Sequence, residues 1–345
     1  MVQRIIGGKR PGATDSSGKP PKPVAGTVPA APAVRRVVID EGSEGQRLDN
    51  FLVKLLKGVP KTHVYRVIRS GEVRVNKGRA DADTRLELGD EVRVPPVRLA
   101  ERGAVPAAPA REFAVVHEDD FLLAINKPAG VAVHGGSGVS SGVIEQLRQA
   151  RPSAKFLELV HRLDKETSGL LLIAKKRSAL VALQDQLRAR ETGKTYAALV
   201  IGAWPASRKV IDVALHKFMT GEGERRVQAV APDAGRRSIT LVRVARALPG
   251  YSLLDVTIKT GRTHQIRVHL THEGHAIVGD DKYGDFALNK AFARGDAAPG
   301  CRFDRMFLHA RRLRFTHPAS GEVLELEAPL PAECEALIRA LAARA

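Results

Sequence analysis

The chain has 345 residues, of which 43% are hydrophobic and two are cysteines, and its formal net charge is +17. This length predicts about two folded domains, with cores large enough to be stable without disulfide bonds. Cys301 and Cys334 match no metal-ligand or disulfide-rich spacing, which favours a reducing cytoplasm. The longest apolar runs are much shorter than the roughly 20 residues of a membrane span. The N-terminal segment also lacks the apolar region of a secretory signal, so we expect neither a membrane partner nor export.

The charge points to a polyanionic partner. An isoelectric point near 10.2 predicts attraction to polyanions, of which nucleic acid is the commonest in a cell. The alternative is a basic protein from an arginine-rich proteome, in which the charge has no specific partner.

Residues 1–34 contain six prolines and five glycines and show no apolar periodicity. Such a segment cannot bury enough surface to order itself, so we predict a disordered basic tail. From Leu48 onward, apolar residues recur at helical spacing up to Leu56, with Gly58 as a stop. A second helix is expected over "KTHVYRVIRSG", with Thr62 as N-cap, and two strands over "EVRVN" and "DEVRVPP". Residues 44–97 are therefore predicted to form a small α-α-β-β domain.

The second predicted helix and the strand after it carry a cluster of cations: Lys61, Arg66, Arg69, Arg74, Lys77 and Arg79. Such a stripe is typical of phosphate binding, although a solvated helix face gives the same pattern. The "RLDNFL" helix, followed by a basic helix that runs into "SGEVRVN", resembles the S4-type RNA-binding domain. This resemblance implies that the six cations bind RNA.

Residues 98–112 return to an Ala/Pro composition and predict a linker. A second domain is expected over residues 113–345. Its predicted strands come in runs, not in strict alternation with helices: "FLLAINKP", "LLLIAKK", "TYAALVIG", "ITLVRVA", "YSLLDVTIKT" and "RRLRFTHP". One clear helix is expected over "SALVALQDQLRAR", with Ser178 as N-cap. The fold class is therefore α+β, with a mixed, largely antiparallel sheet.

Asp164 stands out in "HRLDKETSGLLLIAKK". It lies between Arg162 and Lys165, whose charges favour the ionised carboxylate, and just before a predicted strand. An ionised carboxylate can act as a nucleophile, a general base or a salt-bridge partner. Asp164 and Glu166 could also form a glycosidase pair, but nothing apolar surrounds Glu166 and the charge suits neutral sugars poorly.

Two further segments could carry chemistry. The region "TGRTHQIRVHLTHEGHAIVGDDKYGD" holds four histidines, but their spacing matches no metal motif, and His264 and His269 would face opposite sides of a strand. Arg262 and Arg267 in the same region could pair with a buried acid or a phosphate. In "ETGKTYAALV", Tyr196 is either a base-stacking platform or a core tyrosine.

Taken in order, "HRLDKETSGLLLIAKK", "GKTYAALV", "TGRTHQIRVHL" and "LHARRLRFTHP" resemble the motifs of RluA-type pseudouridine synthases. Residues 126–138, "NKPAGVAVHGGSG", resemble the branch of that family that acts on large-subunit ribosomal RNA. The resemblance implies that the protein converts uridines in 23S ribosomal RNA or its precursor to pseudouridine and acts as a monomer. No metal or other cofactor is expected, and the sequence contains no Walker or GxGxxG motif.

The resemblance also assigns roles to individual residues. It implies that Asp164 is the catalytic nucleophile, acting on the ribose or on the uracil ring, and that Arg262 pairs with it. Tyr196 is expected to stack on the flipped uracil and to assist proton removal, and Arg162 to occupy the space that the base leaves. Two alternatives remain open: another RNA substrate such as tRNA or another ribosomal RNA site, and a non-enzymatic RNA-binding or ribosome-assembly protein.

Overall fold

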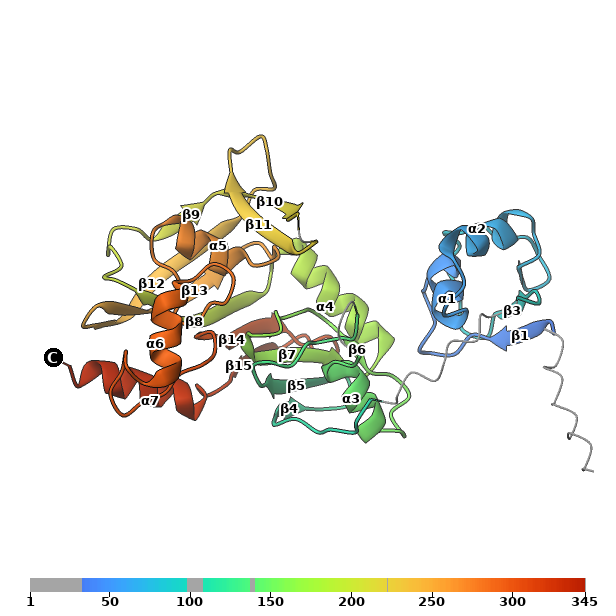
Figure 1. Ribbon diagram of the computed structural model, residues 1–345. Coiled ribbons are helices and arrows are strands. Elements are labelled where there is room, and N and C mark those ends of the chain that lie inside the picture. The colour runs from blue at the N-terminus through green and yellow to red at the C-terminus, as the bar shows by residue number, and fades with distance from the viewer. Residues whose placement is uncertain (1–32, 98–107, 137–139, 222, 345) are drawn as a thin grey trace, which may run out of the picture.

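The computed structural model describes residues 33–97, 108–136, 140–221 and 223–344 (Figure 1). Figure 1 shows a small N-terminal unit in blue and a larger unit that contains the rest of the described chain. The predicted tail, residues 1–34, lies almost entirely outside the described residues, as does most of the predicted linker, residues 98–112.

The N-terminal unit packs two helices on a three-stranded antiparallel sheet. The helices are α1 (Leu48–Leu55) and α2 (Lys61–Arg69), and the strand order is β1 (Arg35–Val38), β3 (Glu91–Val94), β2 (Arg74–Val75). Leu48, Leu52 and Val64 are fully buried, so the helical apolar spacing does mark the core. Strand β1 was not predicted. The expected N-cap at Thr62 is wrong, because Pro60, whose fixed φ suits a helix boundary, occupies that position.

The larger unit is built on one mixed sheet. Its main path runs β4-β5-β7-β14-β8-β13-β12-β9, and β6 and β15 pair with β7 and β14. Strand β14 pairs in parallel with β7 and antiparallel with β8, and the other described pairings in this sheet are antiparallel. The strands are β4 (Val115–Glu118), β5 (Leu122–Lys127), β6 (Glu158–Leu159), β7 (Ser168–Ala174), β8 (Gly193–Ile201), β9 (Val210–Asp212), β12 (Ile239–Leu248), β13 (Tyr251–Ile258), β14 (Leu308–Thr316) and β15 (Val323–Glu327).

Helices cover both faces of this sheet. Because alternate strand residues point to opposite faces, Leu171 and Ile173 of β7 join one core, whereas Leu170 and Leu172 join another. The first core also receives side chains from α3 (Val143–Ala150), α5 (Gln265–His272), α6 (Phe286–Arg294) and α7 (Ala332–Ala342). The second receives α4 (Arg177–Ala189). Every residue of β7 is consequently buried, and its N-terminal end is rigidly placed.

A separate hairpin, β10 (Ala214–Met219) and β11 (Arg225–Val230), projects from the larger unit (yellow in Figure 1). Its buried side chains Leu215 and Val227 pack against Val268 of α5 and against Tyr283. The hairpin is therefore attached to the polypeptide that surrounds α5.

The predicted α+β class is confirmed, as are the six strands quoted from the second domain and the helix over residues 178–190. Two details were wrong. Helix α4 begins at Arg177 with Lys176 as N-cap, so Ser178 lies inside the helix. Residues 265–272 form helix α5, not a strand. The alternation of Ile266, Val268 and Leu270 suits either structure, but Ile266 and Leu270 at i and i+4 share the large core while Val268 packs against the hairpin.

Candidate active site

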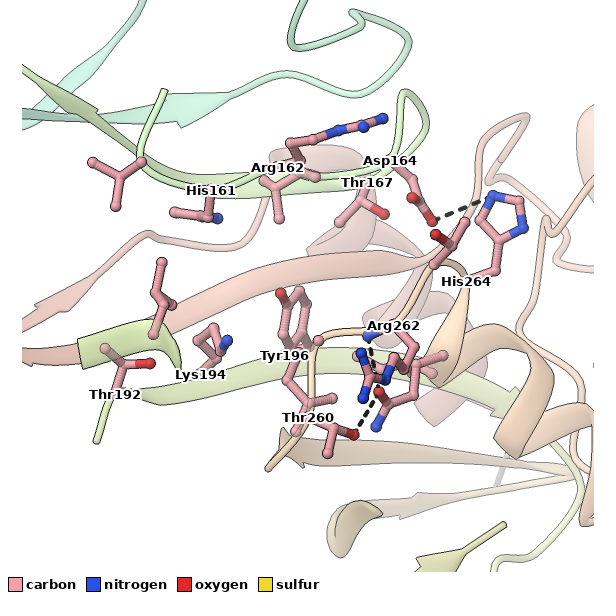
Figure 2. A pocket seen from close by; sticks show the side chains of 18 of the residues that line it. His161, Arg162, Asp164, Thr167, Thr192, Lys194, Tyr196, Thr260, Arg262 and His264 are labelled. Atoms are coloured by element: carbon pink, nitrogen blue, oxygen red, sulfur yellow. Dashed lines mark hydrogen bonds and ion pairs between the residues drawn. The ribbon is translucent and has the colours of Figure 1, made fainter. Parts of the chain in front are cut away.

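A pocket of about 870 Å³ lies where the loop before β7, the start of β8 and the loop before α5 converge (Figure 2). Among the residues that line it are Asp164, Tyr196 and Arg262, the three proposed catalytic residues, together with Arg162. The structure thus brings together residues that lie almost 100 positions apart in the sequence. The pocket continues beyond these residues to Thr192 and Lys194, which also line it (Figure 2).

Asp164 lies in the loop that joins β6 to β7. The Thr167 amide donates to the Asp164 carbonyl over 3.2 Å, which closes a turn around the carboxylate. Gly169, with φ of 107°, then lets β7 approach β14 closely, because a Cβ at this position would lie 2.3 Å from the Ala310 carbonyl oxygen. The sharp turn into this buried strand holds Asp164 just before the N-terminal end of β7, where its side chain is 30% exposed.

A buried lysine supports the same loop from behind. Lys127 Nζ donates to the carbonyls of Pro128, Val131 and Lys165 over 2.9, 2.8 and 3.0 Å. Burial lowers the pKa of Lys127 to about 7, although the charges of Glu166 and Asp164 act in the opposite direction. Its bond to Lys165 fixes the backbone next to Asp164. Lys127 was not singled out in the sequence, where the signal is a lysine at the end of an apolar strand.

The guanidinium that accompanies Asp164 belongs to Arg267. Its Nη1 lies 3.7 Å from Asp164 Oδ2, and its side chain is only 2% exposed. Asp280 accepts two hydrogen bonds from Arg267, at 2.7 and 2.6 Å, and Asp281 accepts another at 2.9 Å. Burial would lower the pKa of Arg267, but these acids raise it further above its ordinary value, so the guanidinium is permanently charged.

The expected pairing of Arg262 with Asp164 is wrong. Within the described part of the chain, no ion pair involves Arg262, which is exposed in the loop before α5. Its backbone amide donates to Gln265 Oε1 over 3.1 Å and so helps to begin the helix. Helix α5 then turns Arg267, not Arg262, toward the interior. The sequence predicts a strand here, and a strand does not indicate that Arg267 points to the interior.

Tyr196 forms part of the pocket wall, from the middle of β8 (Figure 2). Burial and the nearby charge of Asp164 raise its pKa above the ordinary value. The phenol therefore stays protonated at neutral pH, and the free protein holds no phenolate to act as a base. The aromatic ring is presented beside the pocket, which suits the stacking role expected for it.

The rim of the pocket is strongly cationic. Its basic side chains are Arg162, Arg188, Arg190, Lys194, Lys259 and Arg262. Of these, only Arg188 makes an ion pair with another described residue, namely Asp185. Burial lowers the pKa of Lys194, and the neighbouring Thr192 Oγ1 is buried without a hydrogen-bond partner among the described residues. Unpaired cations and an unsatisfied hydroxyl suit a polyanionic ligand.

The alternative chemistries of the sequence find no support in the geometry. Glu166 does not line the pocket of Asp164 but a separate cavity beside Lys127. The histidines near α5 have other partners: His269 contacts Thr240 and Val213, and His275 contacts the Ile201 carbonyl. Among the described residues, no group of three or more His, Cys, Asp or Glu could hold a metal ion. No described helix is long and apolar enough to cross a bilayer.

The N-terminal unit presents the predicted basic cluster at its surface. Lys61, Arg66, Arg69, Lys77 and Arg79 are exposed and Arg74 is partly exposed. None of the six is in the ion pairs of this unit's described residues, which join Arg36 to Glu91, Arg47 to Asp49 and Lys54 to Glu158 of the larger unit. Asn76 and Lys77, with φ of 49° and 67°, form a tight turn that carries the Lys77 side chain outward.

Comparison with known proteins agrees with both units. The family model of RNA pseudouridylate synthases matches residues 121–272, and that of the S4 domain matches residues 46–92. Ribosomal large subunit pseudouridine synthase C of Escherichia coli K12 is 49% identical over 305 residues, which cover 87% of this chain and 94% of that protein. The protein of the same name from Haemophilus influenzae is 47% identical and covers 90% of this chain and 95% of its own.

Solved structures show the same fold at lower identity. Human RNA pseudouridylate synthase domain containing 4 is 26% identical with a TM-score of 0.54, and covers 66% of this chain and 92% of its own. Human RNA pseudouridylate synthase domain containing 1 is 28% identical with a TM-score of 0.52, and covers 67% of this chain and 86% of its own.

These findings define an RNA pseudouridine synthase with an N-terminal S4 domain. The chain belongs to the RluA-type family of these enzymes and, within it, is similar to ribosomal large subunit pseudouridine synthase C. The resemblance recognised in the sequence is confirmed, and the non-enzymatic alternative is not supported.

Proposed function

We propose that the protein isomerises specific uridines of large-subunit (23S) ribosomal RNA, or of its precursor, to pseudouridine in the cytoplasm, acting as a monomer. The observation that supports this most directly is the placement of Asp164 in a cationic pocket beside Arg267 and Tyr196. The similarity to large-subunit synthases over most of the chain supports ribosomal RNA as the substrate.

The reaction breaks the bond between N1 of uracil and C1′ of ribose and forms a bond between C5 and C1′. The hydrogen on C5 leaves as a proton and N1 gains one, so atoms and electrons balance within one nucleotide. In this scheme Asp164 is the nucleophile. The charge of Arg267, 3.7 Å from Oδ2, orients the carboxylate.

Access to the pocket requires that the uridine leave its stack, at a cost of a few kcal/mol. Tyr196 receives the flipped uracil against its ring, and Arg162, exposed at the pocket rim, occupies the space left in the RNA. Lys194 lies two residues before Tyr196 on β8 and thus on the same strand face. It is therefore placed to bind a phosphate next to the flipped base.

The S4 domain supplies a second RNA contact through its six surface cations. It contacts the catalytic domain at the end of β7 opposite to Asp164: Lys54 Nζ lies 3.1 Å from Glu158, which pairs with Ala174 at the C-terminal end of β7, and Arg177 Nε donates to the Glu44 carbonyl over 2.8 Å. These contacts attach the S4 domain to the catalytic domain, so that one RNA can bind to both.

The test is to incubate the purified protein with unmodified 23S ribosomal RNA and, separately, with unmodified tRNA, and to map pseudouridines as carbodiimide adducts that stop reverse transcriptase. We expect discrete stops in 23S RNA and none in tRNA. Stops confined to tRNA would overturn the substrate assignment, and no stops in either RNA would overturn the proposed function.

A further inference from the structure

A chain of polar contacts reaches Asp164 from the β10–β11 hairpin. The Val227 amide on β11 donates to the Tyr283 hydroxyl over 3.0 Å. That hydroxyl lies 2.8 Å from His264 Nδ1, and His264 Nε2 lies 4.0 Å from Asp164 Oδ2. Figure 2 shows the His264 ring facing the Asp164 carboxylate across the pocket.

These contacts favour one tautomer of His264. The Tyr283 oxygen accepts the Val227 N–H, and we assign its own proton to the bond with His264 Nδ1, which leaves the proton of the neutral ring on Nε2. Burial lowers the pKa of His264, and the cations Arg267 and Lys282 lower it too, whereas Asp164 and Asp280 raise it. The net lowering leaves a neutral imidazole whose Nε2–H points toward Asp164.

The ring is held firmly in this orientation. His264 has φ of 53° immediately before α5, and its side chain is only 14% exposed. The His264 ring packs edge to face against the Tyr283 ring, with 5.5 Å between the ring centroids. The Arg267 guanidinium also packs on the Tyr283 ring, 5.2 Å from its centroid. The Tyr283 amide in turn donates to Asp280, the acid that holds Arg267. One frame therefore places both groups that face Asp164.

We propose that His264 is a positioning residue for the reaction. The inference rests on the proposed function, since it needs Asp164 to be the nucleophile. Both His264 and Arg267 approach the same oxygen of Asp164, Oδ2. When the nucleotide fills the pocket, the Nε2–H contact shortens to a hydrogen bond, as such contacts do in complexes. Oδ2 is then occupied by two donors, and Oδ1 is left directed at the substrate.

Two substitutions at His264 separate positioning from a merely structural role. In His264→Gln the amide NH₂ reaches the place of Nε2, whereas in His264→Asn it reaches only that of Nδ1. A structural role would favour Asn, which tolerates positive φ better than Gln. Positioning predicts the opposite order. We expect the single-turnover rate at saturating RNA to fall about ten- to hundredfold in His264→Asn and to stay within about threefold of wild type in His264→Gln.

RNA affinity, measured for both variants, should match wild type, because His264 is not needed to hold the RNA. The melting temperature should be lower in His264→Gln than in His264→Asn, since Gln tolerates the positive φ less well, so a loss of stability cannot account for the expected order of rates. A rate for His264→Asn equal to or above that for His264→Gln overturns the proposal. Tyr283→Phe gives an independent check. It should slow the wild-type enzyme, because His264 then has no fixed tautomer, but should add little to His264→Gln. If Tyr283→Phe lowers the rate equally in wild type and in His264→Gln, Tyr283 does not act through His264 and the proposal is contradicted.

A measurement without RNA keeps this inference separate from the proposed function. Long-range ¹H–¹⁵N correlation spectra of the free protein, with His264 assigned through His264→Gln, should show a protonated Nε2 and a bare Nδ1 at pH 7.5. An imidazolium or an Nδ1–H tautomer overturns the proposal. If wild type makes no pseudouridine in ribosomal RNA, the proposed function fails. The spectrum of the free protein still tests whether His264 directs an Nε2–H toward Asp164.

Discussion

Removing Arg267 should destabilise the catalytic domain as well as inactivate it. In Arg267→Leu, the Asp280 carboxylate, whose side chain is 1% exposed, loses two hydrogen bonds of 2.6 and 2.7 Å and its counter-charge. Breaking a buried ion pair by removing one partner costs about 3–5 kcal/mol. For a domain of this size, such a loss lowers the melting temperature by roughly 6 to 20 °C.

The loss should depend on pH in a defined direction. In wild type, burial raises the pKa of Asp280, but Arg267 and the amides of Lys282 and Tyr283 outweigh burial and lower it. A lowered pKa gives stability that is present above the unfolded value of about 3.9 and is lost as the pH falls through the folded value. Without Arg267, burial dominates and the pKa rises, so the carboxylate destabilises the fold increasingly from pH 4 upward. The difference in melting temperature between wild type and variant should therefore be larger at pH 7.5 than at pH 5.

Scanning calorimetry at the two pH values tests this reasoning, with Arg237→Leu as the matched control. Arg237 pairs with Asp212 at the surface, where an ion pair contributes about 1 kcal/mol or less. The double variant Arg267→Leu/Asp280→Asn should regain much of the stability, because no buried charge is left, but no activity. A shift in Arg267→Leu no larger than in the control, or one that does not change with pH, would refute the account.

Three further predictions concern the loop support and the RNA contacts. The melting temperature of wild type should rise between pH 7 and about 10.4, because Lys127 binds fewer protons in the folded than in the unfolded state across that window. Lys127→Met should remove this rise, and an unchanged rise in the variant would contradict burial of the ammonium. Lys194→Gln should reduce the slope of log affinity against log salt by about 1 while Lys194→Arg preserves it; equal slopes in both would exclude a phosphate contact. Changing Lys61, Arg69 and Lys77 together to Gln should reduce that slope by roughly 2 to 3 without changing the rate at saturating RNA, and an unaltered slope would mean that the S4 domain does not bind the phosphates.

Much of this molecule follows from local sequence patterns, and the exceptions have physical causes. Apolar periodicity predicts the helices of the S4 domain and the strands of the catalytic sheet because each of these elements buries one face or both. The same criterion fails at α5. There, apolar residues at 266, 268 and 270 serve two different cores, and the pattern of a helix with two buried sides resembles that of a strand.

The error at α5 carried over to the site. Asp164 and Tyr196 could be recognised from their motifs and lie in one pocket. The partner of Asp164 could not be recognised in this way, because the choice between Arg262 and Arg267 depends on the direction in which helix α5 points each side chain. Asp280 and Tyr283 hold Arg267 and His264 from a later segment, and no spacing rule links that segment to Asp164. Lys127 was missed because its partners are backbone carbonyls, which leave no mark on the sequence.

The central claim is that Asp164 carries the chemistry of uridine isomerisation. Its most direct test is tritium release from 23S ribosomal RNA labelled at C5 of uridine, because C5 loses its hydrogen when it bonds to C1′. Wild type and Asp164→Asn are compared at saturating protein, with RNA affinity measured in parallel. We predict release by wild type, none above the protein-free background by Asp164→Asn, and affinities that agree within about twofold, because Asn keeps the size and shape of the side chain. Release by Asp164→Asn at a rate near that of wild type would contradict the account.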